Sequence, residues 1–335
     1  MTATALATRT MSDFDVFDEC VAGYQTFATL QILNKTKKRG WFLNNDQLKS
    51  CGWSATLKDF AKGSVIFDYE HCFGMGNTGP VDTGINFQAP RLQILWVSPL
   101  GIEAQEDGDG YKRGTTIGTF EDLDAKAKFD ADKVAAELAD SKNEMYKRKF
   151  TVRTKYLVYI MTKDNQRAHQ TPLVLSIKGL NGTDMAEKHK LFRKEMDNCW
   201  SKFKNFSAPM AMNDKFHACT IFQPTLAADM RGSRSNEICA IESFEIPAYE
   251  TQEEAEASID KFMVPTNEFQ STWEMQETYA DYYTQHAQQT ARRLGGAYGI
   301  KEGVNILPAS VDSGATTVDV VSTPTRDELG ADTTL

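Results

Sequence analysis

Positively charged residues are concentrated in one stretch of this sequence, where their spacing suits the binding of phosphate groups. Between residues 145 and 203, lysine and arginine outnumber aspartate and glutamate by 13 to 5. Lys149, Arg153 and Lys155 occupy odd-numbered positions there, and the even-numbered positions between them are largely apolar. Because side chains alternate between the two faces of a β-strand, a strand at these residues would have one cationic face. Such a face is suited to the backbone of a polyanion.

Aromatic residues accompany these cations on neighbouring segments. Cations that contact phosphates, beside rings that stack on bases, hold single-stranded nucleic acid without sequence preference. The alternative is an ordinary sheet whose cations face solvent and whose rings fill the core. We expect the binding arrangement, because the cations alternate on one face and an acidic region complements them. The predicted nucleic-acid-binding residues are Lys149, Arg153, Lys155, Arg167, Lys178, Trp96, Tyr156, Tyr159, Lys37, Lys38, Arg39 and Trp41.

The acidic region follows the basic one. Residues 237–285 contain 12 acidic side chains against the single cation Lys261, so the net charge of −9 conceals two blocks of opposite sign. In one interpretation the acidic region covers the cationic surface, in the same subunit or a neighbouring one, and competes with nucleic acid. In the other it forms solubilising helices. Further cations on a predicted helix at residues 184–203 either widen the basic surface or solubilise the protein.

No motif in the sequence points to catalysis, a cofactor or a metal. Residues 74–79 match G-x-G-x-x-G, but a dinucleotide site needs a helix to begin there, and Pro80 and a predicted strand follow instead. We therefore expect a flexible loop. His217 and Cys219 lie two apart on a predicted strand without further ligands, so we expect a packed histidine beside a buried cysteine. We predict that the protein is not an enzyme and binds no cofactor or metal.

Cysteine usage and hydropathy indicate a cytoplasmic protein. The six cysteines form no C-x-x-C pair and no disulfide framework, so we expect free thiols in a reducing compartment. The sequence lacks the run of about 18 apolar residues that a membrane span requires. We predict no contact with a membrane.

Patterns of hydrophobicity predict an α+β protein. We expect an antiparallel, OB-like β-barrel or sheet body with an acidic C-terminal helical arm, because a helix is expected between strands of a small barrel. The predicted strands are residues 64–73, 91–97, 148–161, 171–178, 216–222 and 237–246, and the predicted helices are residues 184–203, 252–262 and 268–293. The predicted units are an N-terminal arm (1–40), a core domain (41–250), an acidic helical arm (251–301) and a flexible tail (302–335). The core domain contains a polar insertion (103–144), which we expect to be an exposed helix or a flexible arm.

Short motifs in the middle of the chain resemble a known protein family. Residues 90–95 (PRLQIL), 98–100 (SPL) and 171–179 (TPLVLSIKG) are similar to a family of cyanobacterial proteins carried by plasmids and phages. The resemblance implies a mobile-element context and no catalytic residues. Single-strand-binding proteins are common in that context, which adds support by association.

These observations predict a non-catalytic protein that binds single-stranded nucleic acid, most simply single-stranded DNA, as a homo-oligomer. The alternative is a structural or assembly subunit, as in a phage or filament. In that case the acidic helices of one copy would dock on the predicted strands 148–161 and 171–178 of the next copy, which we call the basic hairpin.

Overall fold

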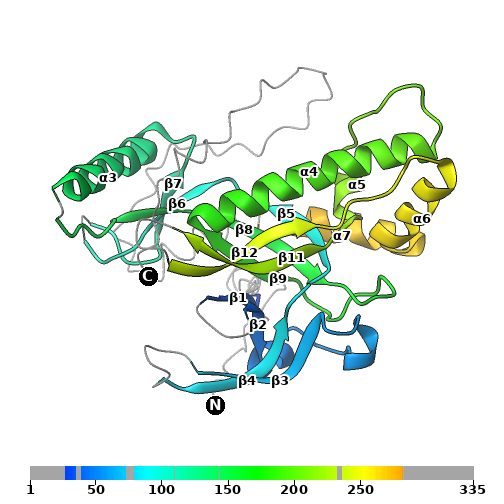
Figure 1. Cartoon of the computed structure of the whole chain (residues 1–335), viewed down its shortest axis with the longest axis horizontal. Helices are drawn as coiled ribbons and strands as arrows, with labels where there is room; N and C mark the ends of the chain where they lie inside the picture. Colours follow the sequence, from blue (N-terminus) through cyan, green and yellow to red (C-terminus); the bar gives the residue numbers. More distant parts are fainter. Residues whose placement is uncertain are drawn as a thin grey trace, which may run out of the picture.

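The computed structural model describes residues 27–34, 39–72, 79–108, 110–142, 144–231, 236–280 and 282 of the 335-residue chain. Within these residues the protein has an α+β fold built on a mixed sheet of ten strands (Figure 1). The strands of the sheet are β1 (Thr29–Leu33), β2 (Gly40–Asn44), β3 (Val65–Cys72), β4 (Val81–Phe87), β5 (Leu92–Val97), β6 (Gly101–Ala104), β7 (Thr116–Thr119), β8 (Phe150–Ile160), β9 (Leu173–Lys178) and β10 (Ile221–Phe222).

We predicted an antiparallel, OB-like barrel or sheet; the sheet is open and mixed, so the barrel alternative and the purely antiparallel pairing are wrong. Its order is β10-β5-β8-β9-β1-β2-β4-β3, and β6 joins β8 on one side and β7 on the other. The strand β1, which lies within the predicted N-terminal arm, inserts between β9 and β2 and pairs in parallel with β9. This insertion extends the sheet instead of returning it to its first strand, so β10 and β3 stay at opposite ends.

The remaining elements pack around this sheet. They are a two-stranded sheet of β11 (Pro224–Arg231) and β12 (Asn236–Phe244), and the helices α2 (Asn45–Ser50), α3 (Leu123–Ser141), α4 (Gly179–Phe203), α5 (Asp214–Ala218), α6 (Gln252–Phe262) and α7 (Phe269–Thr278). Figure 1 shows α4 as the longest helix, with α3 towards its first turns and α6 near its last.

The strongest local patterns predict their elements correctly. The alternation at residues 148–161 and 171–178 forms the antiparallel pair β8 and β9. The helix predicted at residues 184–203 is present as α4 and begins five residues earlier, and its side chains Met185, Phe192, Met196 and Cys199 are buried. The helix predicted at residues 252–262 is α6, where Thr251 and Glu254 form a capping box.

One predicted strand is wrong, because a capping residue starts a helix there. Residues 216–222 form the end of α5 and the short strand β10. The side chain of Asn213 accepts a hydrogen bond from the backbone N–H of Phe216, which satisfies a donor at the helix start. His217 and Cys219 therefore do not share one face of a strand. His217 lies 3.2 Å from Asp197 and is buried.

The polar insertion is a packed substructure instead of a flexible arm. Its strands β6 and β7 and the helix α3 cover the first residues of β8. The buried core between them consists of Ile102, Ala104, Ala125, Phe129, Phe150 and Val152, separate from the main core. The predicted helix is present, but one of its faces is buried.

A stack of rings under the sheet holds a neutral histidine. His169 stacks on Trp53 at 5.9 Å and on Tyr159 at 5.0 Å between ring centroids. Its Nδ1 donates to the Thr171 carbonyl at 2.7 Å, and its Nε2 accepts from the Ile160 N–H at 2.9 Å. Both ring nitrogens are thus used by the neutral form. Burial lowers the pKa of His169 to about 4.

This environment makes the stability of the fold depend on pH. An unfolded histidine titrates near 6.5, so the unfolded chain binds more protons than the folded one as pH falls from about 6.5 to about 4. We expect the free energy of unfolding to fall by about 3 kcal/mol across this window from His169 alone. Urea unfolding from pH 7 to 4 measures the effect. The variant His169→Gln should flatten the pH dependence, and an unchanged slope would contradict the assignment.

Candidate nucleic-acid interface

Three of the predicted phosphate-binding cations lie on one face of β8 and β9, but partners within the chain hold them. Arg153 and Lys178 are cross-strand neighbours. Arg153 Nη2 donates to Glu103 Oε1 at 2.7 Å, and Nη1 donates to Ser176 Oγ at 2.9 Å. Lys155 is half-buried, and burial lowers the pKa of its ammonium even though the Glu103 carboxylate opposes this effect. On this face Arg153 is thus ion-paired and Lys155 is half-buried beside Glu103, whereas Lys178 is exposed.

Arg167 is likewise used inside the molecule. Its Nε donates to Gln93 Oε1 at 2.9 Å, and its Nη2 donates to Thr272 Oγ1 at 2.7 Å. Its Nη1 lies 3.5 Å from a carboxylate oxygen of Glu268, and the guanidinium lies over the Tyr159 ring. Glu268 belongs to the acidic region, so this contact provides one instance of the predicted intrachain cover. It also removes Arg167 from the predicted phosphate contacts.

Most of the predicted stacking residues are inaccessible to a base. Trp41, Tyr156 and Tyr159 are each 1% exposed and pack in the main core, so none of the three rings is open to a base in this structure. Burial raises the pKa of Tyr159 to about 12. Trp96 on β5 and Arg39 before β2 are half-buried, and Lys37 and Lys38 lie outside the described residues. Of the predicted residues, Lys149 and Lys178 are exposed.

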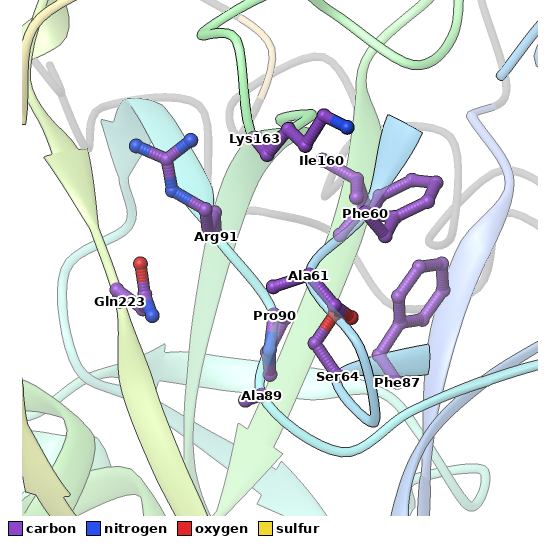
Figure 2. A pocket seen from close by; sticks show the side chains of 10 residues that line it. All are labelled: Phe60, Ala61, Ser64, Phe87, Ala89, Pro90, Arg91, Ile160, Lys163 and Gln223. Atoms are coloured by element: carbon purple, nitrogen blue, oxygen red, sulfur yellow. Dashed lines mark hydrogen bonds between the residues drawn. The ribbon is translucent and has the colours of Figure 1, made fainter. Parts of the chain in front are cut away.

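A crevice beside Arg91 is too small to hold a ligand. Figure 2 shows Arg91 and Lys163 at its rim, with Phe60 and Ile160 among the apolar side chains that line it. Arg91 donates from Nη1 to the Thr162 carbonyl at 2.5 Å and fastens neighbouring loops together. The free volume of the crevice is about 20 Å³, which is room for about one water molecule. We assign the crevice a structural role.

A larger hollow opens between α3, the loop that joins β6 to β7, and the segment that leads into β8. Its free volume is about 390 Å³, within the range of sites that hold small ligands. It is lined by Tyr111, Lys128, Ala131, Asp132, Tyr146, Lys149 and Phe150. Two lysines and three aromatic rings thus meet in one open concavity, and Lys149 is one of the predicted binding residues. We call these seven residues the tyrosine–lysine hollow.

A buried carboxylate positions one wall of the hollow. Asp132 lies on the inner face of α3 and accepts hydrogen bonds from Tyr146 Oη and Arg148 Nε, both at 2.7 Å. It also accepts from the backbone N–H groups of Lys149 at 3.1 Å and Phe150 at 3.2 Å. The side chains of Asp132 and Arg148 are 2% and 8% exposed. These hydrogen bonds hold the Tyr146 side chain and the Lys149 backbone in place. The opposite charges of Asp132 and Arg148 cancel, so the network adds no net charge.

The other wall is formed by Lys128 and Tyr111. Lys128 Nζ donates to Tyr111 Oη at 2.5 Å, and the ammonium lies 5.1 Å from the centre of the tyrosine ring. The hydrogen bond to Tyr111 raises the pKa of Lys128, so its charge persists at neutral pH. The lining thus contains the ammonium groups of Lys128 and Lys149, and its one carboxylate, Asp132, is paired with Arg148. The hollow is therefore suited to an anion that also carries a flat apolar group.

Sequence reasoning missed Tyr111, Lys128 and Tyr146 as site residues. The first two belong to the insertion that we expected to be exposed or flexible, and only packing of α3 brings them to β8. A usable signal was present at residues 145–150, MYKRKF, where an aromatic residue stands at each end of a run of three cations. Such a combination is typical of single-strand-binding surfaces.

The described residues form neither a metal site nor a membrane-spanning helix. These residues contain no group of three or more His, Cys, Asp or Glu side chains placed to hold a metal ion. Within the same ranges, none of the helices has the length and apolar composition needed to cross a bilayer. The cysteines that the structure describes are free thiols: Cys51, Cys72, Cys199, Cys219 and Cys239.

Comparison with known proteins identifies a family but no activity. No curated protein and no solved structure matches the chain. One family model matches residues 25–294, which is well over half of the chain and includes both the sheet and the tyrosine–lysine hollow. The predicted mobile-element context stays a prediction. The chain belongs to the family described as a domain of unknown function, DUF5895.

Proposed function

We propose that the protein binds single-stranded nucleic acid, most simply DNA, through the tyrosine–lysine hollow. The observation that carries the proposal is the meeting of two lysines with tyrosine rings in one open concavity of about 390 Å³. A base stacks on the Tyr111 or Tyr146 ring, and the neighbouring phosphates bind Lys128 and Lys149. Because these contacts use ring faces and backbone phosphates, binding discriminates little between base sequences.

The binding is non-catalytic in this proposal. Lys128 and Tyr146 are engaged with Tyr111 and Asp132 in hydrogen bonds that hold the walls of the hollow. Neither pair forms the nucleophile-and-base arrangement that group transfer requires. The residues thus hold a strand in place, and the proposal assigns them no bond-breaking step.

The alternative, a subunit that assembles through its basic hairpin and acidic helices, stays a prediction. Arg153 and Arg167 of the hairpin already pair with Glu103 and Glu268 of the same chain. These intrachain pairs reduce the positive charge that the hairpin offers to a neighbouring copy. Nucleic-acid binding at the hollow therefore has the better structural support.

Titration of a fluorescein-labelled oligo-dT of about five nucleotides, followed by fluorescence anisotropy, tests the proposal. Two phosphate contacts to Lys128 and Lys149 predict that the logarithm of the association constant falls against the logarithm of salt concentration with a slope of about −1.4. Absence of binding at low salt would contradict the proposal. Light scattering in the same buffers provides the comparison, because salt-sensitive self-assembly without nucleic acid would favour the assembly subunit.

A further inference from the structure

The C-terminal end of α4 carries a second cluster of aromatic rings and lysines. The rings of Trp200 and Phe203 lie 5.5 Å apart between centroids. Lys204 Nζ lies 4.8 Å from the centre of the Trp200 ring and 5.0 Å from that of Phe203. Such cation–π contacts hold the ammonium beside the rings. In Figure 1 this end of α4 lies on the opposite side of the molecule from α3, the helix that carries Lys128 and Asp132 of the hollow.

The loop that follows α4 extends this cluster and is held in place. Phe206 is 46% exposed and Met210 is 55% exposed. The N–H of Phe206 donates to the Ser201 carbonyl at 2.9 Å, and the N–H of Met210 donates to Ser201 Oγ at 2.9 Å. The N–H of Met212 donates to Asp197 Oδ1 at 3.1 Å. An exposed aromatic ring is therefore presented by an anchored loop beside two exposed lysines, Lys202 and Lys204.

The lysines on the outer face of α4 lack the carboxylate partners found elsewhere. Nearby, Arg193 pairs with Asp214 and Lys215 pairs with Glu277. In contrast, no ion pair within the described ranges involves the exposed residues Lys190, Lys194 and Lys202. These three lysines are therefore cations without an ion-pair partner among the described residues, which suits them to the phosphates of a nucleic acid. The acidic helix α6 packs beside the same end of α4.

We infer that the end of α4, at Trp200, Phe203, Lys204 and Phe206, is a second contact point for the same single strand. The inference rests on the proposed function, and it names the substrate class as strands long enough to reach both sites. The 25 residues of α4 span about 37 Å at 1.5 Å per residue. At the stacked rise of about 3.4 Å per nucleotide, that length corresponds to about 11 nucleotides. A base stacks on Phe206, and phosphates bind Lys202 and Lys204.

Two oligo-dT probes separate this contact from the hollow. A labelled probe of about five nucleotides reaches one site only, and one of about 30 nucleotides spans both. In the full chain, the variant Lys204→Glu with Phe206→Ala should bind the long probe about tenfold more weakly than wild type, because base–aromatic stacking and one phosphate contact are lost. The variant Lys62→Glu with Leu57→Ala is the matched control, since it alters an exposed lysine and an exposed apolar residue elsewhere.

The outcomes distinguish the two claims. Unchanged affinity of the α4-end variant for the long probe overturns the inference, as does an equal loss in the control variant. The inference is also overturned if the variant loses binding to an acidic polyglutamate peptide but keeps its affinity for the long probe. The surface would then serve a protein partner. Exchange of Lys128 and Lys149 for glutamate tests the hollow separately. If this exchange leaves the affinity for the short probe unchanged, the proposed function fails. The comparison of the α4-end variant with its control remains interpretable in that case.

Discussion

Replacing Lys128 and Lys149 together with glutamate should weaken the binding of a short oligo-dT by roughly 30-fold at 0.1 M salt. Each phosphate contact to a single strand contributes about 0.7 to the salt slope, so the loss of two contacts removes about 1.4 decades of affinity at this concentration. The salt dependence of binding at the hollow should also become nearly flat, which is measured in a protein that also carries Lys204→Glu and Phe206→Ala. Lys128 and Lys149 both line the hollow, and the carboxylate of Asp132, which also lines it, is paired with the neighbouring Arg148.

The matched control for this experiment is the exchange of Lys58 and Lys62 for glutamate. Both are exposed lysines, and the change in net charge is the same, but they lie outside the hollow. We expect this control to lower affinity by less than about threefold, through long-range electrostatics that salt screens. Equal losses in the two double variants would show that net charge alone drives binding. Circular dichroism of each variant establishes that the fold persists.

The second large effect is expected at Asp132, where Asp132→Ala should lower the free energy of unfolding by about 3–5 kcal/mol. The substitution leaves the buried guanidinium of Arg148 without its carboxylate, and an uncompensated buried charge is costly. It also removes the acceptor for Tyr146 Oη and for two backbone N–H groups. Asp132→Asn retains one acceptor oxygen and should lose less. Urea unfolding at pH 7 measures the difference.

A control on the same helix makes this prediction specific. Asp130 pairs with Lys126 at 2.9 Å, and the two side chains are 49% and 42% exposed. Asp130→Ala should therefore cost no more than about 0.5 kcal/mol. A loss below about 1 kcal/mol for Asp132→Ala would contradict the role assigned to the buried pair. Because Asp132 also fixes Tyr146 and Lys149, the Asp132→Asn protein should bind oligo-dT more weakly even where it remains folded.

The outcome for the basic hairpin shows why a charge pattern alone did not locate the site. Alternation along residues 149–155 correctly places Arg153 and Lys155 on the same face of β8. It carries no information about Glu103, which lies 50 positions earlier in the chain and is delivered to Arg153 by the pairing of β6 with β8. Burial of cations without partners is unfavourable, so a sheet that covers this face must supply the carboxylate. The candidate site accordingly shifts to Lys149, near the start of β8.

Local periodicity determined those elements whose hydrophobic pattern is long and unambiguous. The strand pair β8 and β9, the buried face of α4 and the bounds of α6 follow from spacing between near neighbours, because side chains repeat every two residues in a strand and about every 3.6 in a helix. The block of positive charge at residues 145–203 is likewise a property of the sequence itself.

The tertiary structure alone decided which charges remain available and which rings reach solvent. The strand order leaves the sheet open, with β10 and β3 at its two ends, and close packing buries Tyr156 and Tyr159 in the core. The tyrosine–lysine hollow joins Tyr111 and Lys128 to residues that follow α3 in the chain. Its physical cause is the burial of one face of α3 against β6 and β8, an interaction between segments whose separation in sequence no local pattern encodes.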